Sequence, residues 1–226
     1  EIPKRDWSSD VCSSDLALEK AGDAAGALTH FESVLQLKPD FALAHDTLGQ
    51  LLFRLGRRDD AATHFETALT LQPNFADAHD HLGVALVERG RRAQAVTHYE
   101  TAIKLKPDFP EAHFHLANAL GDLERRADAI AHYEAALRLR PNFPAAEYEL
   151  ANLLLLGGRA AEAVPHYESA VRLRPDYAEA YCNLGSAHFE LGRREAAVAS
   201  FEQALRLKPD FTFARENLAR VRAATK

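Results

Sequence analysis

Prolines return at a fixed interval of 34 residues along most of the chain, and this constrains the fold more than any other feature. Each proline lies in a near-identical phrase, such as LKPDF at Leu37–Phe41 and LRPDY at Leu173–Tyr177. A constant period of about 20–50 residues is typical of repeat proteins, in which each unit buries its apolar face only against its neighbours. We therefore expect stacked units and no central globular core. The series comprises Pro39, Pro73, Pro107, Pro141, Pro175 and Pro209.

Each 34-residue unit contains two helical patterns. In residues 42–75, the apolar residues Ala44, Leu48 and Leu51 follow the i, i+4, i+7 spacing of one helix face. Gly56 interrupts this pattern, and a second stripe ends before Pro73, because proline cannot continue a helix. The sequence therefore predicts an all-α fold built from helix pairs.

Small residues in the first helix of each unit alternate with large aromatic residues in the second. This alternation predicts interdigitated packing between helices that approach closely. The small residues are Gly49, Gly83, Ala117, Ala151 and Gly185, and the aromatic residues are Phe65, Tyr99, Tyr133, Tyr167 and Phe201.

The repeated pattern resembles the tetratricopeptide repeat (TPR) family. The resemblance implies an α-solenoid, a right-handed superhelix of stacked antiparallel helix pairs in 34-residue units. The position that often holds tryptophan in the family holds His45, His79, His113, Glu147 and Tyr181 here. One unit carries the family pattern at Leu82, Gly83, Leu86, Ala95, Tyr99, Ala102 and Pro107.

The period divides the chain into units. We expect a truncated unit at residues 17–41 and a C-terminal capping helix at 212–226. Between them we expect complete units at 42–75, 76–109, 110–143, 144–177 and 178–211.

The first sixteen residues match nothing that follows. They lack the basic and apolar regions of a secretory signal. Asp6–Leu16 resembles the translation of a sequencing-library adapter, so we expect residues 1–16 to be non-native and irregular. The natural N-terminus is then expected to be missing, and the chain to be a fragment.

Composition disfavours several classes of protein. The net charge of −6 argues against a partner held by phosphate neutralisation, so we expect no nucleic acid partner. No apolar run reaches the roughly 18 residues of a membrane helix, so we expect no membrane association and a cytoplasmic location. Low lysine with high alanine and arginine usage suggests a bacterial source.

The residue patterns favour neither catalysis nor metal binding. Histidines that recur once per unit lie on helices about 8–10 Å apart, so they cannot share one ion with ligands near about 2 Å. No HExxH, CxxC, phosphate loop or GxSxG motif is present. We expect no catalytic residues, no metal, no cofactor and no enzyme. The recurring histidines are His30, His64, His98, His132 and His166.

The TPR resemblance implies that the concave face, lined by the first helices, grips a peptide or helix. Spacing places acids on this face (Asp46, Asp77, Asp80, Glu88, Glu111, Asp122, Glu179 and Glu190) against one base, Arg54. Apolar groups rimmed by charge mark interaction sites, so we expect a scaffold for a basic and apolar partner. The expected groove residues are Asp46, Gln50, Phe53, Asp77, Asp80, Val84, Glu111, Phe114, Asn118, Tyr148, Asn152, Leu155, Cys182 and Phe189.

Two other functions follow from relatives within the family. Carboxylate-clamp members grip acidic C-terminal tails with basic groove residues, which this chain lacks, so we expect no partner of that kind. The repeats also resemble the arms of O-linked N-acetylglucosamine transferases and bacterial repeat-fused transferases. Those arms carry a ladder of asparagines, of which only Asn183 and Asn217 match. The alternative function is therefore the arm of a glycosyltransferase or other transferase whose catalytic domain lies outside these residues.

Overall fold

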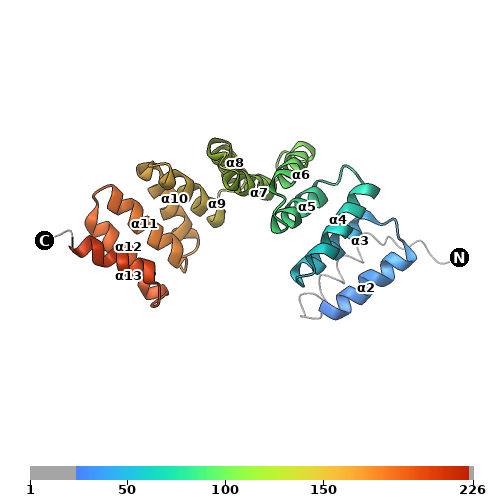
Figure 1. Cartoon of the computed structure of the whole chain (residues 1–226), viewed down its shortest axis with the longest axis horizontal. Coiled ribbons are helices and arrows are strands. Elements are labelled where there is room, and N and C mark those ends of the chain that lie inside the picture. Colours follow the sequence, from blue (N-terminus) through green and yellow to red (C-terminus); the bar gives the residue numbers. More distant parts are fainter. Residues whose placement is uncertain (1–23, 224–226) are drawn as a thin grey trace. The chain divides into compact units, whose positions relative to one another are not determined.

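A computed structural model describes residues 24–223, and within them all regular secondary structure is helical (Figure 1). The expectations for residues 1–16 and for the start of the truncated unit, 17–23, lie outside the described residues. The helices are α2 (Ala24–Leu37), α3 (Ala42–Arg54), α4 (Arg58–Leu71), α5 (Ala76–Glu88), α6 (Arg92–Leu105), α7 (Pro110–Asp122), α8 (Arg126–Leu139), α9 (Pro144–Leu156), α10 (Ala160–Leu173), α11 (Ala178–Glu190), α12 (Arg194–Leu207) and α13 (Thr212–Ala223).

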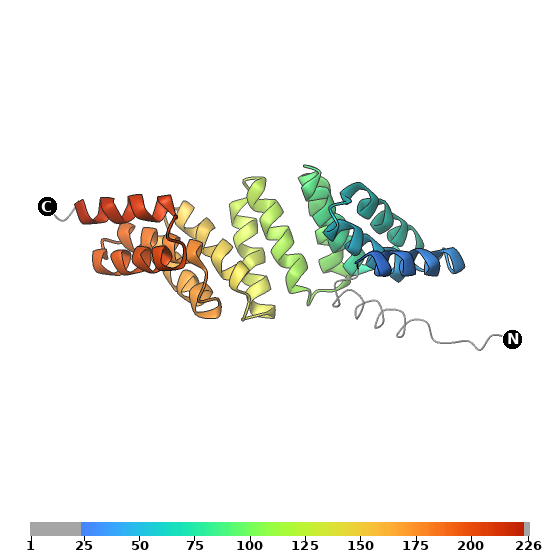
Figure 2. The ribbon, with the colours of Figure 1, turned by 90° about the horizontal axis from the view of Figure 1, so that it is seen from below.

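The chain divides into two compact units, an N-terminal unit up to Lys106 and a C-terminal unit from Pro107. In the first, each of α2–α5 contacts the next helix, and α3 also contacts α5. In the second, each of α7–α12 contacts the next helix, and α7, α9, α11 and α13 contact one another in turn. Figure 2 shows α13 alongside α12. The predicted all-α solenoid is thereby confirmed, while its right-handed superhelix stays a prediction.

We call the odd-numbered helices α3–α13 the A helices and the even-numbered helices the B helices. Small residues of the A helices receive the aromatic rings of the B helices, as predicted. A Cβ atom added at Gly49 would lie 2.6 Å from the Phe65 ring, and one at Gly185 would lie 2.8 Å from the Phe201 ring. Phe65 and Phe201 are almost fully buried. The cores of these two repeats therefore depend on the absence of a side chain opposite the aromatic ring.

The recurrent LKPDF phrase forms a short turn in which its basic residue covers its own aromatic ring. The Lys38 ammonium lies 4.7 Å from the centre of the Phe41 ring, and the Arg174 guanidinium lies 3.2 Å from that of Tyr177. Such contacts contribute about 0.5–1 kcal/mol at exposed sites. The phrase therefore forms a local turn after the B helix, which the contact between cation and ring stabilises.

The turn from each A helix to its B helix requires a left-handed residue. Glycine fills this position at Gly56, Gly90, Gly158 and Gly192, with φ between +71° and +77°, but residue 124 is a glutamate with φ +60°. A left-handed residue with a Cβ costs about 1–2 kcal/mol, whereas glycine adopts this conformation freely. Glu124 is therefore a strained position.

Replacing Glu124 by glycine is expected to raise the free energy of unfolding by about 0.5–1 kcal/mol, since relief of the strain exceeds the chain entropy that glycine adds. Urea unfolding followed by circular dichroism measures the change. The matched control is Gly90→Glu, which should lose a similar amount. No gain from Glu124→Gly would contradict this account of the turn.

The expected C-terminal capping helix is described from Thr212 to Ala223 as α13. Leu218 and Val221 are buried, whereas Arg215, Glu216 and Arg220 are exposed. This helix thus has one apolar face against α12 and one charged face.

Candidate functional site

The expected groove residues all lie on the A helices α3, α5, α7, α9 and α11, but their exposure differs. Asp46, Asp80 and Cys182 are buried, which corrects the expectation that they form open surface. The other members are partly exposed: Gln50, Phe53, Asp77, Val84, Glu111, Phe114, Asn118, Tyr148, Asn152, Leu155 and Phe189.

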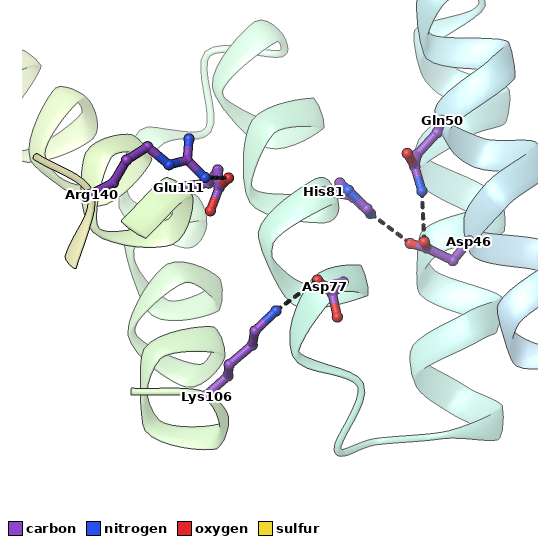
Figure 3. Close-up of polar contacts among 7 residues, drawn as sticks. All are labelled: Asp46, Gln50, Asp77, His81, Lys106, Glu111 and Arg140. Atoms are coloured by element: carbon purple, nitrogen blue, oxygen red, sulfur yellow. Dashed lines mark hydrogen bonds and ion pairs between the residues drawn. The ribbon is translucent and has the colours of Figure 1, made fainter. Parts of the chain in front are cut away.

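Asp46 is only 2% exposed, and its side chain connects the repeat at residues 42–75 with the repeat at residues 76–109. Its carboxylate accepts a hydrogen bond from Gln50 Nε2 at 2.9 Å and one from His81 Nδ1 at 2.8 Å (Figure 3). Burial disfavours the charged form of His81, but the hydrogen bond to Asp46 and the nearby carboxylates outweigh it, so the pKa of His81 is raised. Asp46 therefore holds α3 to α5 through a charged hydrogen bond.

Three expected groove acids are paired with bases of their own repeat. Asp77 lies 3.5 Å from Lys106, and Figure 3 shows this pair and the pair of Glu111 with Arg140. Burial opposes ionisation of Glu111, but the hydrogen bond from Arg140 prevails and lowers the pKa of that carboxyl. Glu179 and Lys208 form the equivalent pair at 3.3 Å.

These pairs correct the expected charge of the concave face. Each joins the start of an A helix to the residue that follows the B helix of the same repeat. A further acid, Glu88, pairs with Arg58 at 3.0 Å. The spacing along single A helices reveals these acids but not the bases that lie at the ends of the B helices. The net negative charge of the face that carries the acids is therefore smaller than expected.

Cys182 belongs to the core. It packs in one cluster with Phe201, Ala214 and Val221. Burial, and then the charge of Glu179, raises the pKa of the thiol to about 11, so the thiol stays protonated at neutral pH. Cys182 is therefore a small apolar residue of the core and not part of an open groove.

The expected aromatic residues pack against rings of their own unit. The Phe114 and Phe143 ring centres lie 4.9 Å apart, and those of Tyr148 and Tyr177 lie 4.6 Å apart. The Phe189 ring of α11 instead meets a cation, the Arg220 guanidinium of α13, 5.1 Å from the ring centre. These rings are therefore partly covered, with only part of each available to a partner.

An open hollow of about 530 Å³ lies among α9, α10, α11 and α13, and we call it the α9–α13 hollow. It brings together three residues expected on the groove face, Asn152, Leu155 and Glu190, with other residues of the same repeats and of α13. Phe213 is one of these: it lies 34 residues after Glu179, although the sequence predicts only a capping role for its helix. The lining residues are Asn152, Leu155, Leu156, Tyr167, Asn183, Ser186, Glu190 and Phe213.

The amides of this hollow are held by a hydrogen-bond network. The Tyr167 hydroxyl donates to Asn152 Oδ1 at 2.7 Å, and Asn183 Nδ2 donates to the same oxygen at 2.9 Å. Asn183 Nδ2 also donates to the Tyr148 hydroxyl at 3.1 Å, and Asn152 Nδ2 donates to Glu149 at 3.1 Å. Side chains fixed in this way present polar atoms without a large entropy cost on binding.

Two exposed apolar side chains line the same hollow. Leu156 is 66% exposed and Phe213 is 54% exposed. They are the two most exposed large apolar residues of the described part of the C-terminal unit. An exposed apolar surface beside ordered amides has the composition of a peptide-binding site.

Histidine pairs are a feature that sequence reasoning missed. The Nδ1 atoms of His45 and His64 lie 2.9 Å apart, and those of His79 and His98 lie 3.0 Å apart. The repeat period relates histidines 34 residues apart, in different repeats, whereas these partners are 19 residues apart within one repeat. The third pair, in the C-terminal unit, is His113 and His132 at 3.0 Å.

Burial lowers the pKa of the B-helix histidine in each pair, and the charge that the partner histidine can carry lowers it further. For His64 the added effect comes first from His45, for His98 from His79 and for His132 from His113. These histidines are therefore neutral at pH 7.

Among residues 24–223, no group of three or more histidine, cysteine, aspartate or glutamate side chains could hold a metal ion. In the same residues, no helix has the length and apolar character needed to cross a bilayer.

Sequence models of the tetratricopeptide repeat match most of the chain. They cover residues 18–83, 110–143 and 178–211, and a further TPR repeat model matches 83–124 and 151–192. A search of curated proteins gives no match.

Solved structures share the fold at low sequence identity. YrrB, described as a TPR protein with an unusual peptide-binding site, is 22% identical with a TM-score of 0.69, over 82% of this chain and 96% of that one. PilF of Pseudomonas aeruginosa is 21% identical with a TM-score of 0.84, over 93% and 96%. PilW, a type IV pilus biogenesis factor, is 21% identical with a TM-score of 0.80, over 96% and 99%. At these identities the likeness concerns the fold alone.

Proposed function

Because this chain belongs to the tetratricopeptide repeat family, we propose that it is a protein-interaction scaffold that holds an extended peptide segment in the α9–α13 hollow. The observation that carries the proposal is the placing of Leu156 and Phe213 beside the ordered amides of Asn152 and Asn183. The unusual peptide-binding site of YrrB supports it by analogy of fold.

The amides of the hollow suit an extended backbone. A peptide presents one N–H and one C=O per residue, and each must find a partner when it leaves water. Asn183 uses its Nδ2 in its hydrogen bonds to Tyr148 and Asn152, so its Oδ1 can accept from a peptide N–H. Ser186 and Asn152 add further polar atoms along the same wall.

The partner segment is expected to combine apolar and basic side chains. Burying an apolar side chain contributes about 1.5–3 kcal/mol, and Leu156 with Phe213 offers the surface for it. Of the expected groove acids, Glu190 lines this hollow, so it would attract one basic side chain. We therefore expect the partner segment to need fewer basic residues than the number of acids on the A helices indicated.

The test selects linear peptides from a random display library on the full chain and measures their affinities by fluorescence anisotropy. The double variant Leu156→Ser/Phe213→Ser is expected to bind the selected peptides at least about tenfold more weakly, a change of about 1.4 kcal/mol. Thermal melting should show that this exposed-site variant stays folded.

The matched control is Leu123→Ser/Leu139→Ser, which removes two exposed leucines of the same unit that lie outside the hollow's lining. It should bind as the unaltered chain does. Equal affinities for the unaltered chain and Leu156→Ser/Phe213→Ser would remove the hollow as the binding site.

The transferase-arm alternative is less well supported. Its asparagine ladder would need Asn183 and Asn217 to face a bound peptide. Asn183 lines the hollow, but Asn217 is buried in α13, and its Nδ2 has no hydrogen-bond partner among the described residues. The ladder therefore ends after one matching position, and we favour the scaffold.

A further inference from the structure

The A-helix histidine of each pair has its protonation fixed by a backbone carbonyl. Nε2 of His45 lies 3.1 Å from the Pro39 carbonyl oxygen, and Nε2 of His79 lies 3.0 Å from that of Pro73. A carbonyl only accepts hydrogen bonds, so Nε2 carries the proton. Nδ1 of the neutral A-helix histidine therefore bears a lone pair.

The two Nδ1 atoms of each pair face each other in one N–H···N hydrogen bond. They lie 2.9–3.0 Å apart, and the ring centres lie 5.2–5.3 Å apart. Since the A-helix Nδ1 accepts this bond, the B-helix Nδ1 donates it. In the third pair, the Pro107 backbone likewise forms a hydrogen bond with the A-helix residue, His113.

This hydrogen bond tolerates one added proton but not two. The first proton goes to Nε2 of the B-helix histidine and leaves the N–H···N bond intact. A second proton has to occupy the A-helix Nδ1, which is the acceptor of that bond. Two cationic rings would then point their N–H groups at each other across 2.9–3.0 Å, so the bond would be replaced by repulsion.

We propose that the three histidine pairs are an acid-sensitive device, which holds the A and B helices of the repeats at residues 42–75, 76–109 and 110–143 together at neutral pH and lets them separate in acid. In the unfolded chain, both histidines of a pair take up a proton near the usual pKa of 6.5. The folded pair holds one added proton at most. Stability is therefore fully present above pH 6.5 and falls as the pH drops below it, because the unfolded chain binds more protons.

Charged groups around the first pair do not cancel this effect. Burial lowers the pKa of His64, and the charge that His45 can carry lowers it further. The carboxylates of Asp60 on α4 and Glu32 on α2 act in the opposite direction, while Arg57 adds to the lowering. The net result is a lowered pKa, so these acids do not compensate for the burial.

The second and third pairs behave in the same way. The pKa of His98 is lowered by burial and then by the charge of His79. Burial is also the main cause of the lowered pKa of His132 and His113. The other charged groups near these two pairs are Glu66 and Arg91 beside His98, Asp128 and Arg125 beside His132, and Arg138 beside His113.

Two of the pairs lie beside open hollows. His45 and His64 line a hollow of about 380 Å³ among α2, α3 and α4, and His98 lines one of about 570 Å³ among α4, α5 and α6. Water in these hollows can deliver protons to the rings and hydrate them once they separate.

The later repeats lack the device. In the fourth, Glu147 replaces the A-helix histidine and lies 2.6 Å from His166. A proton on His166 strengthens this contact, because an imidazolium attracts a carboxylate. In the fifth, Tyr181 and Ser200 occupy the two positions. These two repeats supply α9–α11 to the α9–α13 hollow, so the acid response is separate from the proposed peptide site and does not depend on it.

The experiment follows urea unfolding of the full chain by circular dichroism at pH 7 and pH 5. The comparison is with the triple variant His64→Asn/His98→Asn/His132→Asn. Asparagine places its amide where histidine has Nδ1, so it can donate to the neutral A-helix histidine and accept from the protonated one. From pH 7 to pH 5, the unfolding equilibrium constant of the unaltered chain should rise more than that of the variant, by at least about tenfold for each pair lost in the same transition.

Single variants should each remove the share of one pair, so the test does not depend on the folding of the triple variant. The matched control is His30→Asn, which removes the equivalent B-helix histidine of the truncated unit and should leave the rise unchanged. Equal rises in the unaltered chain and the triple variant would overturn the proposal, as would a loss in His30→Asn as large as in a single pair variant.

A gain-of-function variant tests the proposal in the other direction. Glu147→His gives the fourth repeat a second histidine opposite His166 and should steepen the rise between pH 7 and pH 5 by about a further tenfold. Its control, Glu147→Gln, removes the carboxylate without adding a group that takes up a proton, so it should steepen the rise less. Equal slopes for these two variants would contradict the proton count.

Discussion

Replacing His81 by leucine is expected to lower the free energy of unfolding by about 3 kcal/mol at pH 6. The Asp46 carboxylate is 2% exposed and would keep only its hydrogen bond from Gln50. Removing one partner of a buried ion pair costs about 3–5 kcal/mol, because the other charge stays buried without compensation. We take the lower figure because His81 is partly exposed. Urea unfolding of the full chain measures the change.

Two controls separate the charge from the loss of packing. The double variant Asp46→Leu/His81→Leu removes both charges and should recover most of the stability. The single variant Asn183→Leu removes neutral hydrogen bonds at the equivalent position, to Tyr148 and Asn152, and should cost only about 1–2 kcal/mol. A double variant as unstable as His81→Leu would show that the buried charge is not the cause.

The effect of His81→Leu should depend on pH in a defined direction. The pKa of His81 is raised in the folded state from its usual value of 6.5. Its contribution is therefore fully present below pH 6.5 and is lost as the pH rises through the folded pKa. The loss caused by His81→Leu should accordingly be larger at pH 6 than at pH 9.

Replacing His188 by leucine is expected to raise the free energy of unfolding by about 2 kcal/mol at pH 7. The four preceding repeats hold a buried leucine at this position, at Leu52, Leu86, Leu120 and Leu154. His188 is buried, and its Nδ1 has no hydrogen-bond partner among the described residues. An unsatisfied buried group costs about 1–3 kcal/mol, and leucine removes that cost while it fills the site.

The gain from His188→Leu should grow as the pH falls. Burial, followed by the charge of Arg193, lowers the pKa of His188. The unfolded chain therefore binds more protons below the usual value of 6.5, and the stability of the unaltered chain falls as the pH drops through it. Thermal melts at pH 8 and pH 5 measure the difference between the two chains.

The reverse substitution provides the control. Leu154→His places a histidine at the same position of the preceding repeat and should reproduce both the loss of stability and its pH dependence. If His188→Leu left the acid sensitivity unchanged, the buried imidazole would not be its source.

The stride of 34 residues is enough to predict the helix pairs, because each LKPDF phrase and each left-handed turn is a local structure. It also indicates where Asn152 and Leu155 lie, since A-helix positions repeat with the same register. The same reasoning includes Asp46 among open groove residues, although that position faces the next A helix and receives His81. Position within one helix does not reveal what the neighbouring helix brings.

Contacts between different helices account for the other differences. Asp77 meets a base 29 residues later, and His45 meets His64 19 residues later. These separations follow from the lengths of the helices and of the turn between them, which periodicity alone does not supply. A comparison of residues 19 and 29 positions apart within each repeat would have suggested the contact between His45 and His64 and the contact between Asp77 and Lys106.

The location of these polar contacts bears on how such an array can lengthen or shorten during evolution. The pairs Asp77–Lys106 and Glu179–Lys208 each lie inside one repeat, so a duplicated or deleted repeat carries both charges with it. Asp46 and His81 belong to different repeats. A recombination event that places the repeat carrying Glu149 or Asn183 after Asp46 would leave this carboxylate in the interior without an imidazole, whereas the repeat carrying His115 would supply one.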